Sequence, residues 1–319
     1  MKPVRIAGVG MGVPSEIWHN HRFLAGTRFS RVADIFARCG IQCRHVLGPG
    51  ETTASIATEA ADQALMMSGI SAADIDLIIT ANTLPDDLAY GISSIVQNEL
   101  SARRAAVLDV RAACASFVKG LEIAVSFVET GAYSNILLIG AETPSRVYKE
   151  KPEVAILFGD GAGAVVLTRS EILKPWVFKM GDDGSLWYLI QRRFSGEDTA
   201  VYFEGPKVFY HAVRALVQNA KDVMEKAQVS LRDIDRIIMH QANIRIIRAV
   251  ADQLGLVDRL GRLSRKVPTN ILRYGNTSSA SIPILITELV KKGRLKKGDL
   301  TLLDAIGAGL TSGAVILEW

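Results

Sequence analysis

Two stretches of the 319-residue chain carry the same pattern, and this pattern decides the fold. Residues 71–82 read SAADIDLIITAN, and residues 230–241 read SLRDIDRIIMHQ. Each opens with a turn, carries Asp-Ile-Asp and runs into the apolar, β-branched segment that is typical of a buried strand. Each also follows a long helical pattern, over 55–67 and over 211–227. The sequence therefore predicts that one strand-and-helix unit occurs twice.

Further pairs of segments keep the same order along the chain. The expected helix 115–130 and strand 135–139 correspond to the expected helix 278–292 and strand 299–303. In the same way, GAVVL at 163–167 corresponds to GAVIL at 313–317. The strands are continuous apolar runs, which indicates sheets buried on both faces. We therefore expect an α/β fold of two layered halves, 1–170 and 171–319. The alternative is chance similarity between unrelated strand–helix units.

The composition is that of a soluble globular protein, with 49% hydrophobic and 22% charged residues. The net charge of +4 is modest, aromatic residues make up 7%, and no basic stripe resembles a nucleic-acid interface. We interpret the pairs Lys291-Lys292 and Lys296-Lys297 as a solvated face. Mild positive charge still favours an acidic partner.

Targeting and redox signals favour the cytoplasm. Residues 1–10 lack the basic region and cleavage site of a signal peptide, and no apolar run approaches the roughly 20 residues of a membrane span. Three cysteines, Cys39, Cys43 and Cys114, cannot form a disulfide framework. Cys39 and Cys43 have no second ligand pair at zinc spacing, so a metal site is not expected.

Three residues are candidates for chemistry. Cys114 follows an expected strand and opens a helix, where the helix dipole favours the nucleophilic thiolate; the alternative is a small buried hydrophobe. His240 lies at the carboxyl end of a strand, where ligands of α/β sheets bind, unless it is a core histidine. Asn276 lies 162 positions after Cys114, the same offset that separates Gly131 from Gly293. It is either an N-cap or the residue that faces Cys114 across a pseudo-twofold axis.

Glycine-rich turns and repeated aspartates are weaker candidates. Residues 158–163 read FGDGAG but lead into a strand, so we interpret them as a tight turn and not as a dinucleotide site. Residues 307–309 read GAG, and their backbone N–H groups are able to hold an oxyanion. The aspartates of the repeat are expected to be turn residues: Asp74, Asp76, Asp233 and Asp235.

Three motifs together resemble one family. Cys114 within AACASF, His240 within HQANIRI and Asn276 within YGNTSSAS resemble the β-ketoacyl-acyl carrier protein synthase III family. Residues 158–163 and 307–313 fit the same pattern, and the resemblance spans almost the whole chain. It implies a thiolase-like fold, a duplicated five-layer αβαβα arrangement, and a homodimer.

The resemblance also implies roles for these residues. Cys114 would accept the acyl group from acyl-CoA or acyl-acyl carrier protein, with the oxyanion held by the backbone N–H groups of Cys114 and Ala308. His240 and Asn276 would bind malonyl-acyl carrier protein or malonyl-CoA. Loss of CO₂ would then give a carbanion that attacks the acyl thioester. This carbon–carbon bond formation needs no metal or redox cofactor.

Several positions depart from the family pattern. Asp34 and Pro152 stand where the family has the tryptophan and arginine that enclose the adenine of coenzyme A, whereas Arg38 is retained for its phosphates. Ile306 replaces the usual phenylalanine, and Ala308 the middle glycine of a triplet. In the carrier-docking helix Arg245 is kept, but two lysines become Asp252 and Gln253. We expect a specialised synthase that takes acyl groups from a carrier protein or from a longer thioester. The expected pocket residues are Leu84, Tyr90, Ile156, Phe158, Leu189 and Ile306.

Other activities remain open at this point. An acyltransferase of the same fold would move an acyl group to an alcohol or amine without decarboxylation. A catalytically silent subunit would shape a heterodimer, and a Cys–His–Asn hydrolase would use the same residue types. Acyl length, the carrier of the primer, and fatty acid as against secondary metabolism are not set by the motifs.

Overall fold

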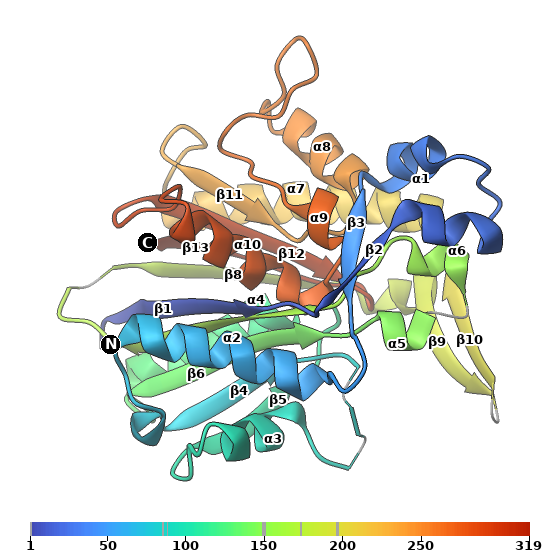
Figure 1. Cartoon of the computed structure of the whole chain (residues 1–319). Helices are drawn as coiled ribbons and strands as arrows, with labels where there is room; N and C mark the ends of the chain where they lie inside the picture. Colours follow the sequence, from blue (N-terminus) through green and yellow to red (C-terminus); the bar gives the residue numbers. More distant parts are fainter. Residues whose placement is uncertain (1, 85, 88, 149–150, 173, 196–197) are drawn as a thin grey trace.

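A computed structural model of the chain describes residues 2–84, 86–87, 89–148, 151–172, 174–195 and 198–319. Two sheets lie one above the other in Figure 1, with helices between them and on their outer faces. This is the five-layer arrangement that the repeat and the resemblance predict.

The first sheet has five strands in the order β1-β7-β6-β4-β5. β4 runs parallel to both β5 and β6, whereas β7 is antiparallel to β6 and β1. β1 and β5 are the two edge strands. The bounds are β1 (Val4–Gly12), β4 (Leu77–Ala81), β5 (Ala106–Val110), β6 (Asn135–Glu142) and β7 (Gly161–Arg169).

The second sheet repeats this order with four strands, β11-β12-β13-β8. β11 is parallel to β12, and the pairs β12–β13 and β13–β8 are antiparallel. The pairs β4–β6, β6–β7 and β7–β1 of the first sheet have the same orientations. A loop takes the place of a fifth strand, since the Ile237 N–H donates to the Lys266 carbonyl at 2.7 Å. The bounds are β8 (Trp176–Asp182), β11 (Arg236–Met239), β12 (Leu300–Gly307) and β13 (Thr311–Glu318).

The second aspartate of each Asp-Ile-Asp repeat makes the same hydrogen bond in both halves. Asp76 Oδ2 accepts from the Asn135 N–H at 3.0 Å, at the start of β6. Asp235 Oδ2 accepts from the Leu300 N–H at 2.9 Å, at the start of β12. The Asp-Ile-Asp pattern therefore fastens one parallel strand to the next. These side chains are structural turn residues.

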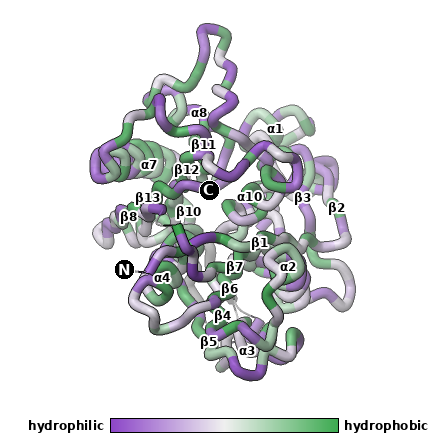
Figure 2. Tube along the Cα trace, turned by 90° about the vertical axis from the view of Figure 1, so that its left-hand side faces the viewer, coloured by the Kyte–Doolittle hydropathy of each residue, from purple (hydrophilic) through white to green (hydrophobic). Residues whose placement is uncertain are grey.

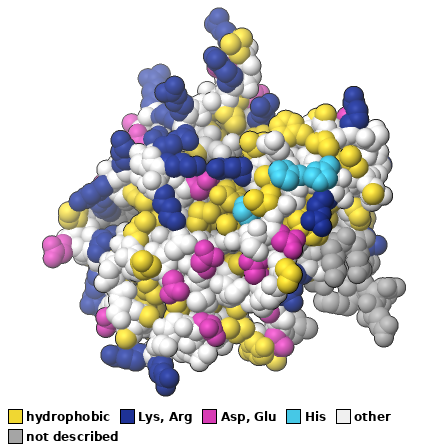
Figure 3. Space-filling model, in the orientation of Figure 1, with side chains coloured by type: hydrophobic (Ala, Val, Ile, Leu, Met, Phe, Trp, Pro, Cys, Tyr) yellow, Lys and Arg dark blue, Asp and Glu magenta, His cyan; other side chains and the backbone are white. Residues whose placement is uncertain are grey.

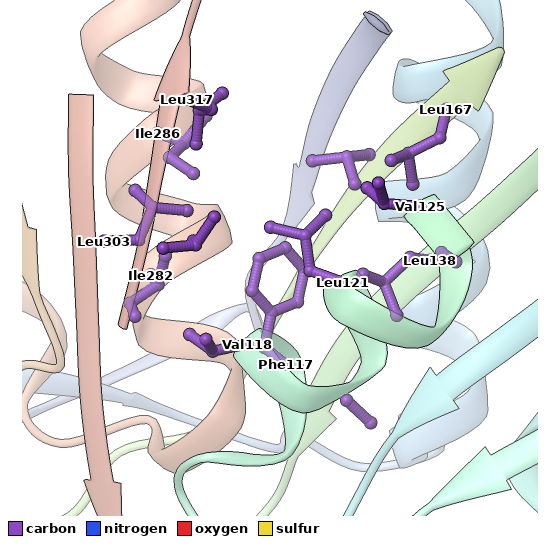
Figure 4. Close-up of a cluster of buried hydrophobic side chains, with 14 of the residues drawn as sticks. Phe117, Val118, Leu121, Val125, Leu138, Leu167, Ile282, Ile286, Leu303 and Leu317 are labelled. Atoms are coloured by element: carbon purple, nitrogen blue, oxygen red, sulfur yellow. The ribbon is translucent and has the colours of Figure 1, made fainter. Parts of the chain in front are cut away.

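The central layer consists of α4 (Ser116–Thr130) and α10 (Ser281–Lys291). Figure 4 shows Phe117, Leu121 and Val125 of α4 among side chains of both sheets, and α10 contributes Ile282 and Ile286 to the same core. The helices are apolar nearly all round because each is covered on two sides.

Further helices cover the outer faces. α2 (Thr53–Ser68) and α3 (Ile92–Glu99) cover the first sheet, and α7 (Gly205–Ala227) and α8 (Ile244–Gln253) cover the second. α2 lies so close to β1 that a Cβ on Gly10 would be 2.0 Å from the Ala60 carbonyl oxygen. The hydropathy colouring of Figure 2 places hydrophobic residues on the inner strands β4, β6 and β7, and hydrophilic residues on the outer loops.

Each half carries an insertion between its first strand and its first long helix. The N-terminal insertion contains β2 (Glu16–His19), η1 (Asn20–Gly26), α1 (Val32–Cys39) and β3 (Cys43–Val46). The C-terminal insertion contains η3 (Gly184–Leu189), β9 (Ile190–Ser195) and β10 (Asp198–Phe203). The hairpin β9–β10 extends away from the sheets in Figure 1.

The remaining short helices lie in loops that join these elements. They are η2 (Ala72–Asp74), α5 (Ser145–Tyr148), α6 (Pro152–Ala155), α9 (Ile271–Tyr274) and η4 (Ser278–Ala280). Among the described residues, no helix has both the length and the apolar character that a membrane span requires. Lys and Arg gather on the upper part of the face shown in Figure 3, over the C-terminal half.

Candidate active site

Cys114 lies in a tight turn between β5 and α4. The residue before it, Ala113, has a left-handed backbone with φ of 49°. Ser116 fixes this turn, because its Oγ accepts from the Ala112 N–H at 2.7 Å and donates to the Ala113 carbonyl at 2.6 Å. Gly307 packs against the turn so closely that a Cβ there would be 2.6 Å from the Cys114 nitrogen. The end of β12 is thereby held beside the backbone N–H of the candidate nucleophile.

The thiol of Cys114 is not the thiolate that its place at a helix start favours. The pKa of Cys114 is raised to about 12, mainly by burial and to a smaller extent by the nearby Glu142 carboxyl. The Ser278 hydroxyl, 3.3 Å from the Cys114 sulfur, and the Cys114 backbone N–H lower this pKa, but their effect is smaller than that of burial. The expectation of a thiolate in the free enzyme is therefore wrong. The sulfur must lose its proton when it attacks.

His240 directly follows β11 and is 2% exposed. Its backbone N–H donates to the Asp304 carbonyl at 2.8 Å, which joins it to β12. Its ring Nδ1 is 2.7 Å from the Ser281 Oγ, and the same Oγ accepts from the Gln241 N–H. Burial lowers the pKa of His240 to about 3, so the imidazole is neutral. When the Ser281 hydroxyl donates to Nδ1, the ring proton lies on Nε2, as a hydrogen-bond donor requires.

Asn276 is clamped through both its backbone and its side chain. Its N–H donates to the Leu157 carbonyl at 3.0 Å, and its carbonyl accepts from the Gly159 N–H at 3.1 Å. Its Oδ1 accepts from the Ser278 N–H at 2.8 Å. This bond orients the amide, so that Nδ2 remains as a donor for a ligand. The turn at residues 158–163 thus positions Asn276, and a Cβ on Gly159 would be 2.1 Å from the Tyr274 carbonyl oxygen.

One cavity of about 1130 Å³ brings the three candidates together. Cys114 comes from the first half of the chain, whereas His240 and Asn276 come from the second. The other expected site residues on its wall are Arg38, Leu84, Phe158, Arg245, Ile306 and Ala308. The duplicated fold therefore builds one site from both halves.

Three expected pocket residues do not line this cavity. Leu189 and Ile156 are fully buried inside the protein, Ile156 within an apolar cluster that includes Ile35 and Phe23. Tyr90 precedes α3 and is 52% exposed on the surface. For these residues the expectation of an acyl-pocket role is not met within the chain, because the direction of a loop side chain is not set by its place near a motif.

Sequence reasoning missed the side chains that surround the catalytic candidates. Ser278 contacts Cys114, Ser281 contacts His240, and Glu142 contacts Ser278. The two serines lie in the quoted YGNTSSAS motif, where a run of small polar residues at a buried helix start was a usable signal. Glu142 had a signal as well, since it is the one carboxylate of the apolar run NILLIGAE.

The family of this chain follows from comparison with known proteins. Residues 108–184 match the model of 3-oxoacyl-[acyl-carrier-protein] synthase III, and residues 224–319 match its C-terminal model. A beta-ketoacyl-[acyl-carrier-protein] synthase III of Rickettsia massiliae is 38% identical over 321 residues, covering 99% of each chain.

Solved structures agree with this match. The 3-oxoacyl-[acyl-carrier-protein] synthase III of Aquifex aeolicus superimposes with a TM-score of 0.91 at 38% identity, covering 99% of this chain and 100% of its own. The priming beta-ketosynthase of the R1128 polyketide pathway superimposes with a TM-score of 0.91 at 30% identity, covering 99% and 96%. The chain therefore belongs to the β-ketoacyl-acyl carrier protein synthase III family of thiolase-like acyltransferases, which form carbon–carbon bonds.

Proposed function

We propose that this chain transfers an acyl group from a thioester to Cys114 and then condenses it with a malonyl thioester, with loss of CO₂. The observation that carries the proposal is the shared cavity, in which a buried thiol and two neutral hydrogen-bond donors line one space. The first half-reaction needs a nucleophile, and the second needs donors for an enolate oxygen.

In the first half-reaction the Cys114 sulfur attacks the acyl carbonyl. The tetrahedral oxyanion accepts hydrogen bonds from the backbone N–H groups of Cys114 and Ala308, which the packing of Gly307 against Cys114 supports. Such donors act strongly because the site is shielded from water. The carrier thiolate then leaves, and the acyl group remains on Cys114.

In the second half-reaction the malonyl carbonyl accepts hydrogen bonds from His240 Nε2 and Asn276 Nδ2. Decarboxylation places negative charge on that oxygen as the enolate forms. A donor aimed at a developing charge lowers the barrier by about 3 kcal/mol, so the pair is well suited to this step. The carbanion attacks the acyl thioester, and a β-ketoacyl product forms. The proposed chemistry uses no metal or redox cofactor.

The acyl donor is proposed to be a longer chain or one that is held by a carrier protein, in preference to acetyl-CoA. Asp34, at the family's adenine-stacking position, is paired with Arg31 at 2.7 Å on the surface, and Pro152 packs beside Gly26. Neither side chain offers an aromatic ring or a guanidinium group to adenine. The cavity also exceeds the roughly 300–1,000 Å³ of most small-molecule sites. Apolar residues on its wall are Trp187, Phe203, Phe209, Ile306 and Leu310.

The remaining assignments are also proposals. We divide the chain at 170/171, which is supported by the end of β7 at Arg169 and the start of β8 at Trp176. We place the protein in the cytoplasm, and a homodimer is supported by the exposed edge strand β5, on which Val107 and Leu108 are 40% and 36% exposed. Arg245 and the basic C-terminal half offer an acidic carrier protein a complementary surface.

A two-stage experiment tests the proposed function. The protein is incubated with acyl thioesters of increasing length, on coenzyme A and on acyl carrier protein, and the acyl mass on Cys114 is measured. Malonyl-acyl carrier protein is then added, and CO₂ and product are measured. The proposal predicts labelling followed by CO₂ release. Acyl transfer to an alcohol or amine without CO₂ would favour the non-decarboxylating acyltransferase. Preference for acetyl-CoA over every other donor would refute the proposed donor class.

A further inference from the structure

The Ser278 hydroxyl bridges Cys114 and a buried carboxyl group. Its Oγ lies 3.3 Å from the Cys114 sulfur and 3.0 Å from Glu142 Oε1. A hydroxyl carries one proton, so it cannot donate to both groups at once. When it donates to Glu142, its oxygen is free to accept the S–H of Cys114. The three groups then form a continuous path for a proton.

Glu142 is fully buried at the end of β6, and its two carboxyl oxygens differ in their hydrogen bonds. Oε1 receives the Thr83 N–H at 3.1 Å and contacts the hydroxyls of Ser278 and Ser279 at 3.0 and 3.1 Å. Oε2 has no hydrogen-bond partner among the described residues. Two opposing effects act on the charge of such a carboxyl group, because hydrogen-bond donors favour the anion while burial favours the neutral acid.

The charge surroundings of Glu142 agree with this geometry. No Lys or Arg within the described part of the chain forms an ion pair with it. Burial raises the pKa of Glu142 to about 6, close to neutral pH. An acyl chain on Cys114 would fill the cavity beside it and remove more water. The neutral acid is then favoured further.

We infer that Glu142 holds the Cys114 proton while the enzyme is acylated, acting through the Ser278 hydroxyl, and returns it during condensation. The inference rests on the proposed function. It makes Glu142 a positioning residue for a proton, since Glu142 itself does not touch the sulfur. Ser278 makes that contact.

The proton and electron count closes over both half-reactions. As the sulfur–carbon bond forms, the Cys114 proton passes to Ser278 Oγ and the Ser278 proton passes to Glu142. The carrier thiolate leaves with its electron pair and takes a proton from solvent. After loss of CO₂, the enolate carbon bonds to the acyl carbon and expels the Cys114 thiolate. The Glu142 proton then moves to Ser278, and that of Ser278 to the sulfur.

Infrared difference spectroscopy at neutral pH tests this role directly. Acylation of the wild-type protein should produce a carboxylic acid C=O band that shifts in D₂O and with ¹³C-labelled glutamate. The band should vanish when a malonyl thioester is added. Glu142→Gln should lack the band and acylate on the order of 10²-fold more slowly. The same substitution at the exposed Glu99 should leave both band and rate unchanged.

Kinetics of Ser278→Ala separate a proton path from a purely structural role. The acylation rate should fall as in Glu142→Gln, and the double variant should be no slower than either single variant, because both break one path. Full acylation of the wild type without a new acid band, or wild-type acylation by Ser278→Ala, would overturn the inference. If no thioester acylates Cys114, the proposed function fails. Iodoacetamide, which also replaces the thiol proton by carbon, then tests the relay on its own.

Discussion

Replacing Asn276 by Asp removes one hydrogen-bond donor from the site and adds a negative charge. The carboxylate keeps the oxygen that accepts from the Ser278 N–H at 2.8 Å, and the backbone bonds to Leu157 and Gly159 are unaffected. Only the Nδ2 donor is lost. Loss of one such donor typically costs about 3–4 kcal/mol, which corresponds to on the order of 10²–10³-fold in rate. We expect this reduction in decarboxylative condensation, and the added negative charge acts in the same direction.

The two half-reactions are measured separately. Acyl mass on Cys114 reports the first and should form within a few-fold of the wild-type rate. Release of labelled CO₂ from malonyl-acyl carrier protein, per acylated enzyme, reports the second and should fall. Asn98→Asp, the same change at an exposed position of α3, serves as the control. If Asn276→Asp slowed acylation and left CO₂ release unchanged, the role given to Asn276 would be refuted.

Further expectations concern stability, measured as the free energy of unfolding in urea. Gly10→Ala should lower it by about 3 kcal/mol, because the new Cβ would meet the Ala60 carbonyl, whereas Gly184→Ala, with open space around it, should change it by about 0.5 kcal/mol at most. Phe117→Ala in the central layer should lower it by about 3–5 kcal/mol, and a smaller loss would contradict the packing between the sheets. Burial lowers the pKa of His240 from 6.5 to about 3. The contribution of the neutral imidazole to the free energy of unfolding is therefore complete above pH 6.5 and is lost as the pH falls towards 3. In His240→Gln the free energy of unfolding should fall less steeply between pH 6.5 and 3. An unchanged pH dependence would contradict the burial of a neutral imidazole.

The duplication could be predicted because the same local sequence pattern occurs in both halves. The turn, the Asp-Ile-Asp and the apolar strand recur, and the side-chain bonds of Asp76 and Asp235 show why the pattern is repeated. The offset between Cys114 and Asn276 predicted that they begin equivalent segments, and the structure places both on one cavity. The periodicity and spacing of the sequence were therefore sufficient to predict the architecture.

Features that depend on burial could not be predicted from the same patterns. A helix start favours thiolate, but the pKa of Cys114 is set mainly by the residues that exclude water, and these come from distant segments. The contact of Ser278 with Glu142 joins residues 136 positions apart through the pairing of β6 with η4. Leu189 and Tyr90 were misplaced because the direction in which a loop side chain points is not set by its place near a motif.

Both insertions contribute to the wall of the cavity. One supplies Arg38 and the other supplies Trp187 and Phe203 to the cavity wall, and neither contributes Cys114, His240 or Asn276. Part of the cavity wall and the three catalytic candidates thus lie in separate segments of the chain. Changes in either insertion would alter that part of the cavity wall and would leave the sheets, and the reacting groups that they hold, unchanged.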